Sequence, residues 1–416
     1  MKHNRFKKVT LLAFCFLFAN VAYGQSEVKA KKSSTIRIDT RNISNEISNL
    51  FRTVAVEIKK IDFEKVGDAI GTAAEEVGRE VEREIGDIEI IITDKNDRDD
   101  PESQGEYVGT AEKTRIISKT YSVDQNDKLA INNQYGKVTV HTWAKNEIKV
   151  DIQVKAFEAT ESDAASLLES VKVTDLRQTN LISFKTTFEK TSLNFWSKIR
   201  NGKEERRGVQ VNYEIYMPAN NPLDITNRYG GTVLPDFSGP VNINSSYGGF
   251  AADKLDNPAN QVKVSYGSAS IGDYSNGNLV VTYGGLNMAH ASKVNATIKY
   301  SGAKIDKLSN GGTFDLSYSG GFKIDDVDKN VKNLIINASY SGVSLGIDEN
   351  ADIDFDVTVS YAGFNYGSNK VNLVNQLSDT NKSKSWTPTK NYKGSIGKGS
   401  DSRIIIKSNY GGVKFF

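Results

Sequence analysis

The sequence is poor in the residues that form covalent crosslinks and many reactive sites. Its 416 residues include 1 cysteine, 3 histidines and 7 prolines. Cys15 lies in an N-terminal apolar run, so the remainder of the chain can form neither a disulfide nor a thiolate metal site. The chain instead contains 34 glycines and 18 tyrosines. This composition indicates a β-rich repeat protein that is stabilised by burial rather than by crosslinks.

Residues 1–24 have the three parts of a secretory signal peptide. Basic residues come first, the apolar run "VTLLAFCFLFANVA" follows, and small residues precede Gln25. The bulky Phe14 before Cys15 argues against a lipoprotein cleavage site. We expect cleavage after Gly24 and an exported protein that is periplasmic, associated with the outer membrane, or extracellular.

The basic character of the chain belongs to this leader. The formal net charge is +2, but residues 1–24 carry four basic side chains and no acidic one, which leaves 49 basic against 51 acidic residues. Such a balance is not typical of a nucleic-acid-binding surface. No later stretch is long and apolar enough for a membrane-spanning helix, so no transmembrane segment is expected in the mature chain.

The first part of the mature chain differs in pattern from the rest. Residues 25–39 are predicted to be a flexible start. In residues 40–93, apolar side chains recur mostly three or four positions apart, which predicts one broken amphipathic helix or two. This segment is expected to pack on the β domain or to mediate self-association through 40–92. A helix on a membrane surface is the alternative, opposed by the mixed charges of its polar face.

A charged linker and a β-rich region follow. Residues 94–114 are rich in charged and turn-forming residues and predict a linker. Residues 115–218 show the alternation of strands, with a short helix over 160–173 that begins at the N-cap Thr160. The basic stretch 194–208 is predicted to be a loop.

Residues 219–416 consist of repeats, each with a tyrosine followed by small residues, mostly Gly-Gly or Ser-Gly. The intervals from Tyr229 to Tyr361 are 17 to 22 residues, which is the signature of a repeat architecture. A long loop at about 375–400 interrupts the pattern. The aligned tyrosines, including one earlier copy, are Tyr135, Tyr229, Tyr247, Tyr266, Tyr283, Tyr300, Tyr318, Tyr340, Tyr361 and Tyr410.

The spacing of apolar residues within a repeat predicts two corners. Around Tyr283, apolar residues stand two and four positions before the tyrosine and three, five and eight positions after it. A straight strand keeps one face at even spacings, so the chain must turn or bulge twice. We expect the tyrosine on the apolar face and a positive φ at Gly284 or Gly285. Stacked coils of this kind predict a β-solenoid, and an up-and-down β-barrel or a sandwich is the alternative.

The tyrosines themselves allow two interpretations. A structural ladder, in which each ring packs on the ring of the next coil with its hydroxyl near water, follows from the expected apolar position. An exposed platform that stacks on sugar rings is the other interpretation, and the expected burial argues against it.

No catalytic, cofactor-binding or metal-binding residue can be assigned. His141 and His290 stand alone, without a second ligand at metal spacing, and are predicted to lie on the surface. Asp352, Asp354 and Asp356 alternate with apolar residues and share an outward face. Such carboxylates could bind calcium or act on a polysaccharide. A solvated acidic strand that discourages aggregation is the favoured interpretation.

The repeats also carry a resemblance. The stretches "KLAINNQYGKVTVHTW" and "RIIIKSNYGGVKFF", with the "YGG" and "YSG" units between them, resemble the secreted putative-adhesin family of β-strand-repeat proteins of bacterial envelopes. The resemblance covers roughly residues 115–416. It implies a β-repeat fold and an envelope location, and no catalytic residue, since the function of that family is largely unassigned.

These observations favour a non-enzymatic secreted or cell-envelope protein with an adhesin-like or scaffolding role. Its expected partner is an envelope protein or a glycan surface. The first alternative is a periplasmic partner in envelope signalling. The second is a polysaccharide-active enzyme built on a β-helix, which would need outward carboxylates that converge in one groove.

Overall fold

The computed structural model describes the greater part of the chain after residue 110. Its described ranges are 36–38, 90–92, 111–189, 196–200, 203–348, 350–367, 371–377 and 388–416. The predictions for residues 1–24 and for most of the helical segment and linker therefore lie outside the described residues. Two short strands differ from those predictions, because β1 (Ile36–Ile38) and β2 (Ile90–Ile92) pair in parallel.

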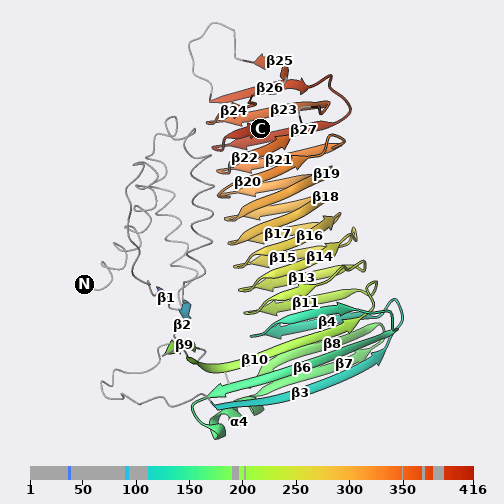
Figure 1. The fold of residues 1–416 in the computed structure, drawn as a ribbon, viewed down its shortest axis with the longest axis vertical. Coiled ribbons are helices and arrows are strands. Elements are labelled where there is room, and N and C mark those ends of the chain that lie inside the picture. Colours follow the sequence, from blue (N-terminus) through green and yellow to red (C-terminus); the bar gives the residue numbers. More distant parts are fainter. Residues whose placement is uncertain are drawn as a thin grey trace, which may run out of the picture.

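The described chain is mainly β. Strands lie one above another from the N-terminal to the C-terminal part, and the sheet does not close on itself (Figure 1). One helix, α4 (Glu161–Ser170), is present among the described residues. No helix in this described part is long and apolar enough to cross a membrane.

Each repeat adds one strand to each of two parallel ladders. The strand before a tyrosine pairs with its equivalent in the next repeat, as Val262 does with Leu279, and the strand after it does the same. We call one repeat with its strands a rung. Two strands, β18 (Gly285–Lys299) and β19 (Gly302–Ser317), run through both ladders. The strands before the tyrosines are β4 (Lys128–Gln134), β11 (Leu223–Arg228), β13 (Val241–Ser246), β15 (Gln261–Ser265), β17 (Asn278–Thr282), β21 (Asn333–Ser339), β23 (Ile353–Ser360) and β27 (Arg403–Asn409). Those after them are β5 (Val138–Thr142), β12 (Thr232–Leu234), β14 (Phe250–Leu255), β16 (Ala269–Ser275), β20 (Phe322–Val327), β22 (Val343–Ile347), β24 (Phe364–Asn365) and β28 (Val413–Phe415).

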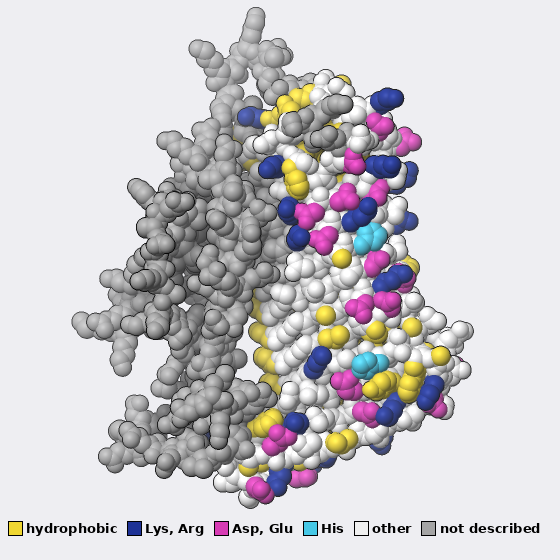
Figure 2. Space-filling model, in the orientation of Figure 1, with side chains coloured by type: hydrophobic (Ala, Val, Ile, Leu, Met, Phe, Trp, Pro, Cys, Tyr) yellow, Lys and Arg dark blue, Asp and Glu magenta, His cyan; other side chains and the backbone are white. Residues whose placement is uncertain are grey.

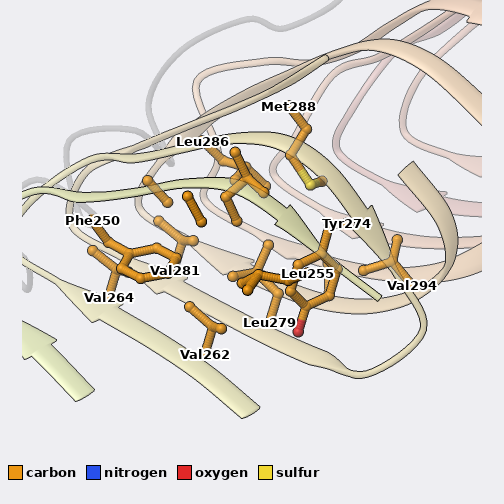
Figure 3. Close-up of a cluster of buried hydrophobic side chains, with 14 of the residues drawn as sticks. Phe250, Leu255, Val262, Val264, Tyr274, Leu279, Val281, Leu286, Met288 and Val294 are labelled. Carbon is orange, nitrogen blue, oxygen red and sulfur yellow. The ribbon is translucent and has the colours of Figure 1, made fainter. Parts of the chain in front are cut away.

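The core lies between the two ladders and continues from rung to rung. Figure 3 shows side chains of successive rungs in contact, among them Val264, Val281, Leu286 and Met288, all of which are buried. The buried Tyr274 satisfies its hydroxyl by donating to the carbonyl of Asn278, at 2.8 Å. Because every rung covers the apolar side chains of its neighbours, the stack buries surface that one repeat could not bury alone.

The first corner differs from the sequence prediction. Neither Gly284 nor Gly285 has a positive φ, and the left-handed conformation belongs to the tyrosine itself, with φ of 57° at Tyr283. The same holds at all ten aligned tyrosines, where φ lies between 51° and 63°. This conformation turns the tyrosine side chain away from the core, so the prediction that it lies on the apolar face is wrong.

The glycine after the tyrosine is required for a different reason. A Cβ on Gly284 would stand 2.0 Å from the carbonyl oxygen of Gly267 in the neighbouring rung. Gly284 therefore allows two backbones to approach closely, a role that needs no unusual φ. Later rungs have serine here, and the Ser301 hydroxyl accepts the N–H of Gly284 at 3.1 Å.

The second corner contains a local break in the alternation of β18. Ala289 and His290 both point outward between the buried Met288 and Ala291. Two consecutive outward residues shift the parity, as the sequence spacing requires.

An antiparallel layer covers the N-terminal end of the stack. It contains β3 (Ala111–Ser122), β6 (Glu147–Glu158) and β10 (Lys203–Met217), while β7 (Val171–Gln178) pairs with β8 (Leu181–Phe188) beside β4. Strand β3 thus begins inside the range predicted as linker. The stretch predicted as the loop 194–208 contains β9 (Trp196–Arg200), which pairs with the start of β10. The atypical end layer keeps polar groups toward solvent where no further rung follows.

Helix α4 begins as its sequence predicts. Thr160 is the N-cap, and its hydroxyl oxygen accepts the backbone N–H of Asp163 at 3.1 Å. This bond satisfies one of the free N–H groups of the first turn. The helix ends at Ser170, three residues before the predicted end, because Val171 starts β7.

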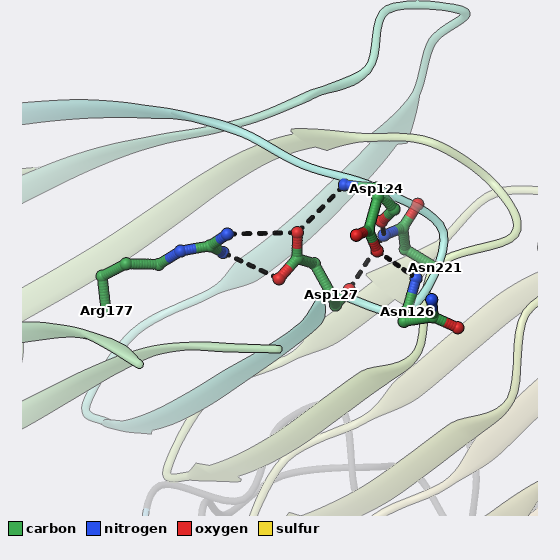
Figure 4. Close-up of polar contacts among 5 residues, drawn as sticks. All are labelled: Asp124, Asn126, Asp127, Arg177 and Asn221. Atoms are coloured by element: carbon green, nitrogen blue, oxygen red, sulfur yellow. Dashed lines mark hydrogen bonds and ion pairs between the residues drawn. The ribbon is translucent and has the colours of Figure 1, made fainter. Parts of the chain in front are cut away.

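An ion pair of the buried Asp127 holds the turn between β3 and β4. The carboxylate of Asp127 accepts a hydrogen bond from one terminal nitrogen of Arg177 at 3.1 Å and lies 3.0 Å from the other, and it accepts the backbone N–H of Asp124 at 2.9 Å (Figure 4). The amide of Asn221 donates to the carbonyls of Asp124 and Asp127. Burial alone would raise the pKa of Asp127, but the Asp124 N–H and the Arg177 guanidinium outweigh it and hold the pKa below its ordinary value.

We expect Asp127→Asn to lower the free energy of unfolding by about 1–3 kcal/mol at pH 7. Because the folded pKa is depressed, the charged carboxylate stabilises the fold above its unfolded pKa of about 3.9, and this contribution disappears as the pH falls through the folded value. Urea unfolding of both proteins at pH 7 and pH 3 should show a smaller difference at pH 3 than at pH 7. The matched control is Asp326→Asn, which breaks the exposed pair with Lys307 and should have little effect. An equal loss at both pH values would contradict the role of the charge.

The C-terminal part of the stack does not follow sequence order. Strand β27 pairs with β21 on one side and with β23 on the other, so residues 403–416 lie between two rungs that precede them in the chain. Strand β26 (Thr389–Ile396) runs antiparallel to β23 and also pairs with β25 (Val371–Leu377). Much of the predicted loop at 375–400 is therefore strand, and its residues 378–387 lie outside the described residues.

Candidate functional site: the tyrosine row and the polar grid

Ten tyrosine rings form a continuous stacked row on the outside of the molecule, which we call the tyrosine row. Neighbouring ring centroids are 4.6 to 5.2 Å apart, and the ring planes differ by at most 19°. Seven rings are 37–47% exposed. In stacking order the row contains Tyr135, Tyr229, Tyr247, Tyr266, Tyr283, Tyr300, Tyr318, Tyr340, Tyr410 and Tyr361.

The row presents ring edges and hydroxyls rather than ring faces. Each inner ring has a neighbour on both faces, so a sugar ring cannot stack on it as the exposed-platform interpretation requires. Desolvation first, and then the neighbouring tyrosines, raise the pKa of Tyr247 and Tyr283. The row is a line of hydroxyl groups, and a tyrosine hydroxyl can both donate and accept a hydrogen bond.

The left-handed backbone of each tyrosine must be held by its surroundings. This conformation costs an ordinary residue about 1–2 kcal/mol, whereas a stacked aromatic pair contributes about 0.5–1.5 kcal/mol beyond its buried area. Stacking on two sides thus offsets the strain. A bulky residue without an aromatic ring at this position would keep the backbone strain and lose the stabilisation from stacking.

We expect Tyr266→Val to destabilise the protein more than Tyr266→Asn, by about 1–2 kcal/mol. Both variants remove the contacts with Tyr247 and Tyr283, whose centroids are 4.7 and 4.9 Å away, but asparagine tolerates the left-handed conformation and a β-branched residue does not. Thermal unfolding followed by circular dichroism compares the two variants. Equal midpoints would show that the backbone conformation at this position carries no energetic cost.

An open groove of about 350 Å³ lies beside four members of the row. Its lining comes from β19, β21, β27 and β23, which are neighbours in the ladder. The outward side chains one and three positions before the tyrosines form two lines across these strands. We call them the polar grid, which consists of Ser317, Ser339, Asn409 and Ser360 in one line and Asp315, Asn337, Lys407 and Thr358 in the other.

Side-chain size explains where the groove begins and ends. On β18 the position opposite Ser317 is Lys299, a much larger residue. At the other end β26 adds Asn391 and Thr389, whose side chains bond to Thr358 and Ser360 at 2.8 Å. Between these limits the line next to the tyrosines contains only serine and asparagine, so the surface is hollow there.

Much of the hydrogen-bonding capacity of the grid is unused. Asn337 donates to Asp315 at 2.9 Å. Within the described residues, no side-chain hydrogen bond or ion pair is found for Ser317, Ser339, Lys407 or Asn409. These four side chains offer hydroxyl, amide and ammonium groups to a molecule in the groove.

The three aspartates singled out by the sequence do not form a group that could hold a metal ion. Asp352 accepts the backbone N–H of Lys398 at 2.7 Å and so fixes a turn. Asp356 lies 3.2 Å from the ammonium of Lys393. Burial alone would raise the pKa of Asp356, but bonds from Asn391 and Lys393 outweigh it and lower this pKa. No group of three potential metal ligands occurs in the described part of the chain.

The two histidines have partners on the outer surface. His141 lies 2.8 Å from the carboxylate of Glu214 and stacks on Tyr216. His290 lies 2.8 Å from the hydroxyl of Ser309 in the next rung. Neither histidine belongs to the polar grid, and the surface location predicted for both agrees with these contacts.

The outer face away from the row carries both signs of charge. Figure 2 shows a vertical line of hydrophobic side chains at the left edge of the described surface, and mixed acidic and basic side chains over the face beside it. Many of these charges pair across rungs, as Lys304 does with Asp325 at 3.1 Å. A face of mutually neutralised charges attracts neither polyanions nor polycations strongly.

Comparisons with known proteins give only distant structural neighbours. No family model and no curated protein matches the chain. Solved structures similar to it include a putative adhesin from Bacteroides fragilis, with 8% identity, a TM-score of 0.30, and coverage of 73% of this chain and 97% of that one. A putative cell adhesion protein from Clostridium sporogenes has 8% identity and a TM-score of 0.20, with coverage of 73% and 99%. A putative lipid binding protein from Parabacteroides distasonis has 9% identity and a TM-score of 0.32, with coverage of 73% and 96%.

These neighbours include putative adhesins, the kind of protein that the repeat motifs resemble. Identities of 8–10% and TM-scores of 0.20–0.32 assign neither a family nor a function to this chain.

Proposed function

We propose that the protein is a non-enzymatic, exported envelope protein, in which a β-solenoid presents an adhesin-like or scaffolding surface. The observation that carries the proposal is the regular outer surface of the stack. Ten tyrosines and the polar side chains before them repeat at the spacing of neighbouring β-strands, close to 4.8 Å. An extended partner with a short chemical repeat can make the same contact on successive rungs, so that weak contacts add up.

Two features of the described chain support a binding role over catalysis. The carboxylates Asp352 and Asp356 are engaged in a turn and in an ion pair, and neither lines the groove beside the tyrosine row. The polar grid instead contains neutral hydroxyl and amide groups, which suit recognition. The signal peptide predicted for residues 1–24 supports export.

The proposal is tested with the protein from residue 25 onward. We expect saturable binding to isolated cell envelopes or to a glycan array, without cleavage of the bound material. Product release is measured in the same samples. Clear turnover of a polysaccharide without any surface binding would contradict the proposal and favour the enzyme alternative.

The alternative role in envelope signalling makes a separate prediction. It places the docking element in the amphipathic segment, so deletion of 40–92 should abolish co-purification of an envelope protein. Retention of that partner by the shortened chain would instead place the contact on the β stack.

A further inference from the structure

We propose that the polar grid binds a linear, uncharged polysaccharide that lies across β19, β21, β27 and β23. This inference rests on the proposed function and names the ligand class of its surface. The groove spans four neighbouring strands, and the two lines of polar side chains cross these strands in the stacking direction. A ligand along this axis meets one pair of grid residues per strand.

The backbone groups of the grid strands are paired within the ladder, so only side chains are available to bind a ligand. Strand β21 pairs with β19 on one side and with β27 on the other, and β27 pairs in turn with β23. An extended peptide usually binds by adding a strand to an exposed sheet edge. Inner strands offer no such edge, so a ligand must itself carry many hydrogen-bonding groups. A chain of sugars has hydroxyls on every unit.

Charge argues against a polyanion. The grid contains one carboxylate, Asp315, and one ammonium group, Lys407, so its formal charges cancel. Binding of nucleic acids or other polyanions depends on several cationic contacts. The remaining groups, such as the hydroxyls of Ser317 and Ser339 and the amide of Asn409, can both donate to and accept from neutral hydroxyls.

The tyrosine row lies next to the site without lining it. Tyr318, Tyr340, Tyr410 and Tyr361 directly follow the grid residues on the same four strands and are 37–47% exposed. None of these four tyrosines is among the residues that line the groove, and their ring faces remain stacked on one another. Recognition in the groove therefore depends on the grid side chains, and it does not require a sugar ring to displace a stacked tyrosine.

The experiment fills the groove with one substitution. A control makes the same substitution at the equivalent register position outside the groove. Ser339→Trp places a large side chain in the middle of the grid, whereas Ser246→Trp places it before Tyr247, outside the grid. Binding is measured by affinity electrophoresis in gels that contain a neutral linear polysaccharide, using dextran, pullulan, xylan and mixed-linkage glucan in turn. We expect at least one of these to retard the protein, Ser339→Trp to weaken retardation by tenfold or more, and Ser246→Trp to leave it unchanged.

A second variant removes hydrogen-bonding groups and does not fill the groove. Ser339→Ala with Asn409→Ala deletes two side chains without a side-chain partner in the described residues, and we expect a fivefold or greater loss of binding with the same unfolding midpoint as wild type. Retardation by alginate but not by neutral polysaccharides would overturn the uncharged ligand class. Equal binding by wild type and both groove variants would overturn the location.

The two proposals fail in different ways. Envelope binding that survives Ser339→Trp, with no retardation by any neutral polysaccharide, would refute the groove inference and leave the proposed function standing. If the wild-type protein shows no binding to envelopes, the proposed function itself is refuted. Binding of an extended peptide to the grid would also overturn the inference, because the inference assigns this site to a polysaccharide.

Discussion

Gly284→Val is expected to lower the free energy of unfolding by more than about 3 kcal/mol, because overpacking of this kind forces the backbone to move. The added Cβ would stand 2.0 Å from the Gly267 carbonyl oxygen, a backbone atom that also belongs to a tightly paired rung. Gly285→Val is the matched control. Its Cβ would have the Ser268 hydroxyl as nearest neighbour, at 3.3 Å, and a loss within about 1 kcal/mol is expected.

Urea unfolding followed by circular dichroism measures both variants, and Gly284→Ala adds a sharper comparison. Because the conflict arises at the Cβ atom, alanine should cause a large part of the loss seen with valine. Similar effects of Gly284→Val and Gly285→Val would mean that the close approach of rungs does not explain the glycine pair.

Deletion of residues 403–416 is expected to unfold the C-terminal part of the stack. The deletion removes the strand between β21 and β23, together with the buried side chains of Ile404, Ile406, Val413 and Phe415. Burial of each such side chain contributes about 1.5–3 kcal/mol. We therefore expect proteolysis at the lysines near residue 330 under conditions in which the full chain resists cleavage.

Two substitutions within β27 distinguish the effect of lost core packing from the effect of a shortened chain. Ile406 is buried, whereas the preceding Ile405 points outward. Ile406→Asn should destabilise the protein by about 2–5 kcal/mol, and Ile405→Asn should have a much smaller effect. An unchanged unfolding midpoint after the deletion would contradict the placement of β27 inside the stack.

The sequence pattern predicted the repeat and its two corners, but not the direction of the tyrosine. Apolar residues at fixed offsets from Tyr283 are buried as expected, for example Val281 and Leu286. The parity argument located the first corner correctly but could not say which residue adopts the unusual φ. Glycine is the usual choice there, and the structure uses tyrosine because stacking across rungs compensates for the strain.

The candidate site was only partly visible in the sequence. The serines and asparagine before Tyr318, Tyr340, Tyr361 and Tyr410 are a weak signal, since similar residues precede other tyrosines. Their grouping depends on β27 entering the stack between β21 and β23, which no local pattern indicates. Local signals such as the Thr160 cap were read correctly because they depend on neighbours in the chain.

The position of β27 also governs the order in which the molecule can be completed. Residues 353–365 leave the ribosome before residues 403–416, yet they join the stack through them. Until those later residues arrive, β21 and β23 each have an unpaired edge, which is a site of mispairing and aggregation. A single late event then satisfies both edges, so the slow step of folding should follow the arrival of the segment that begins at Arg403.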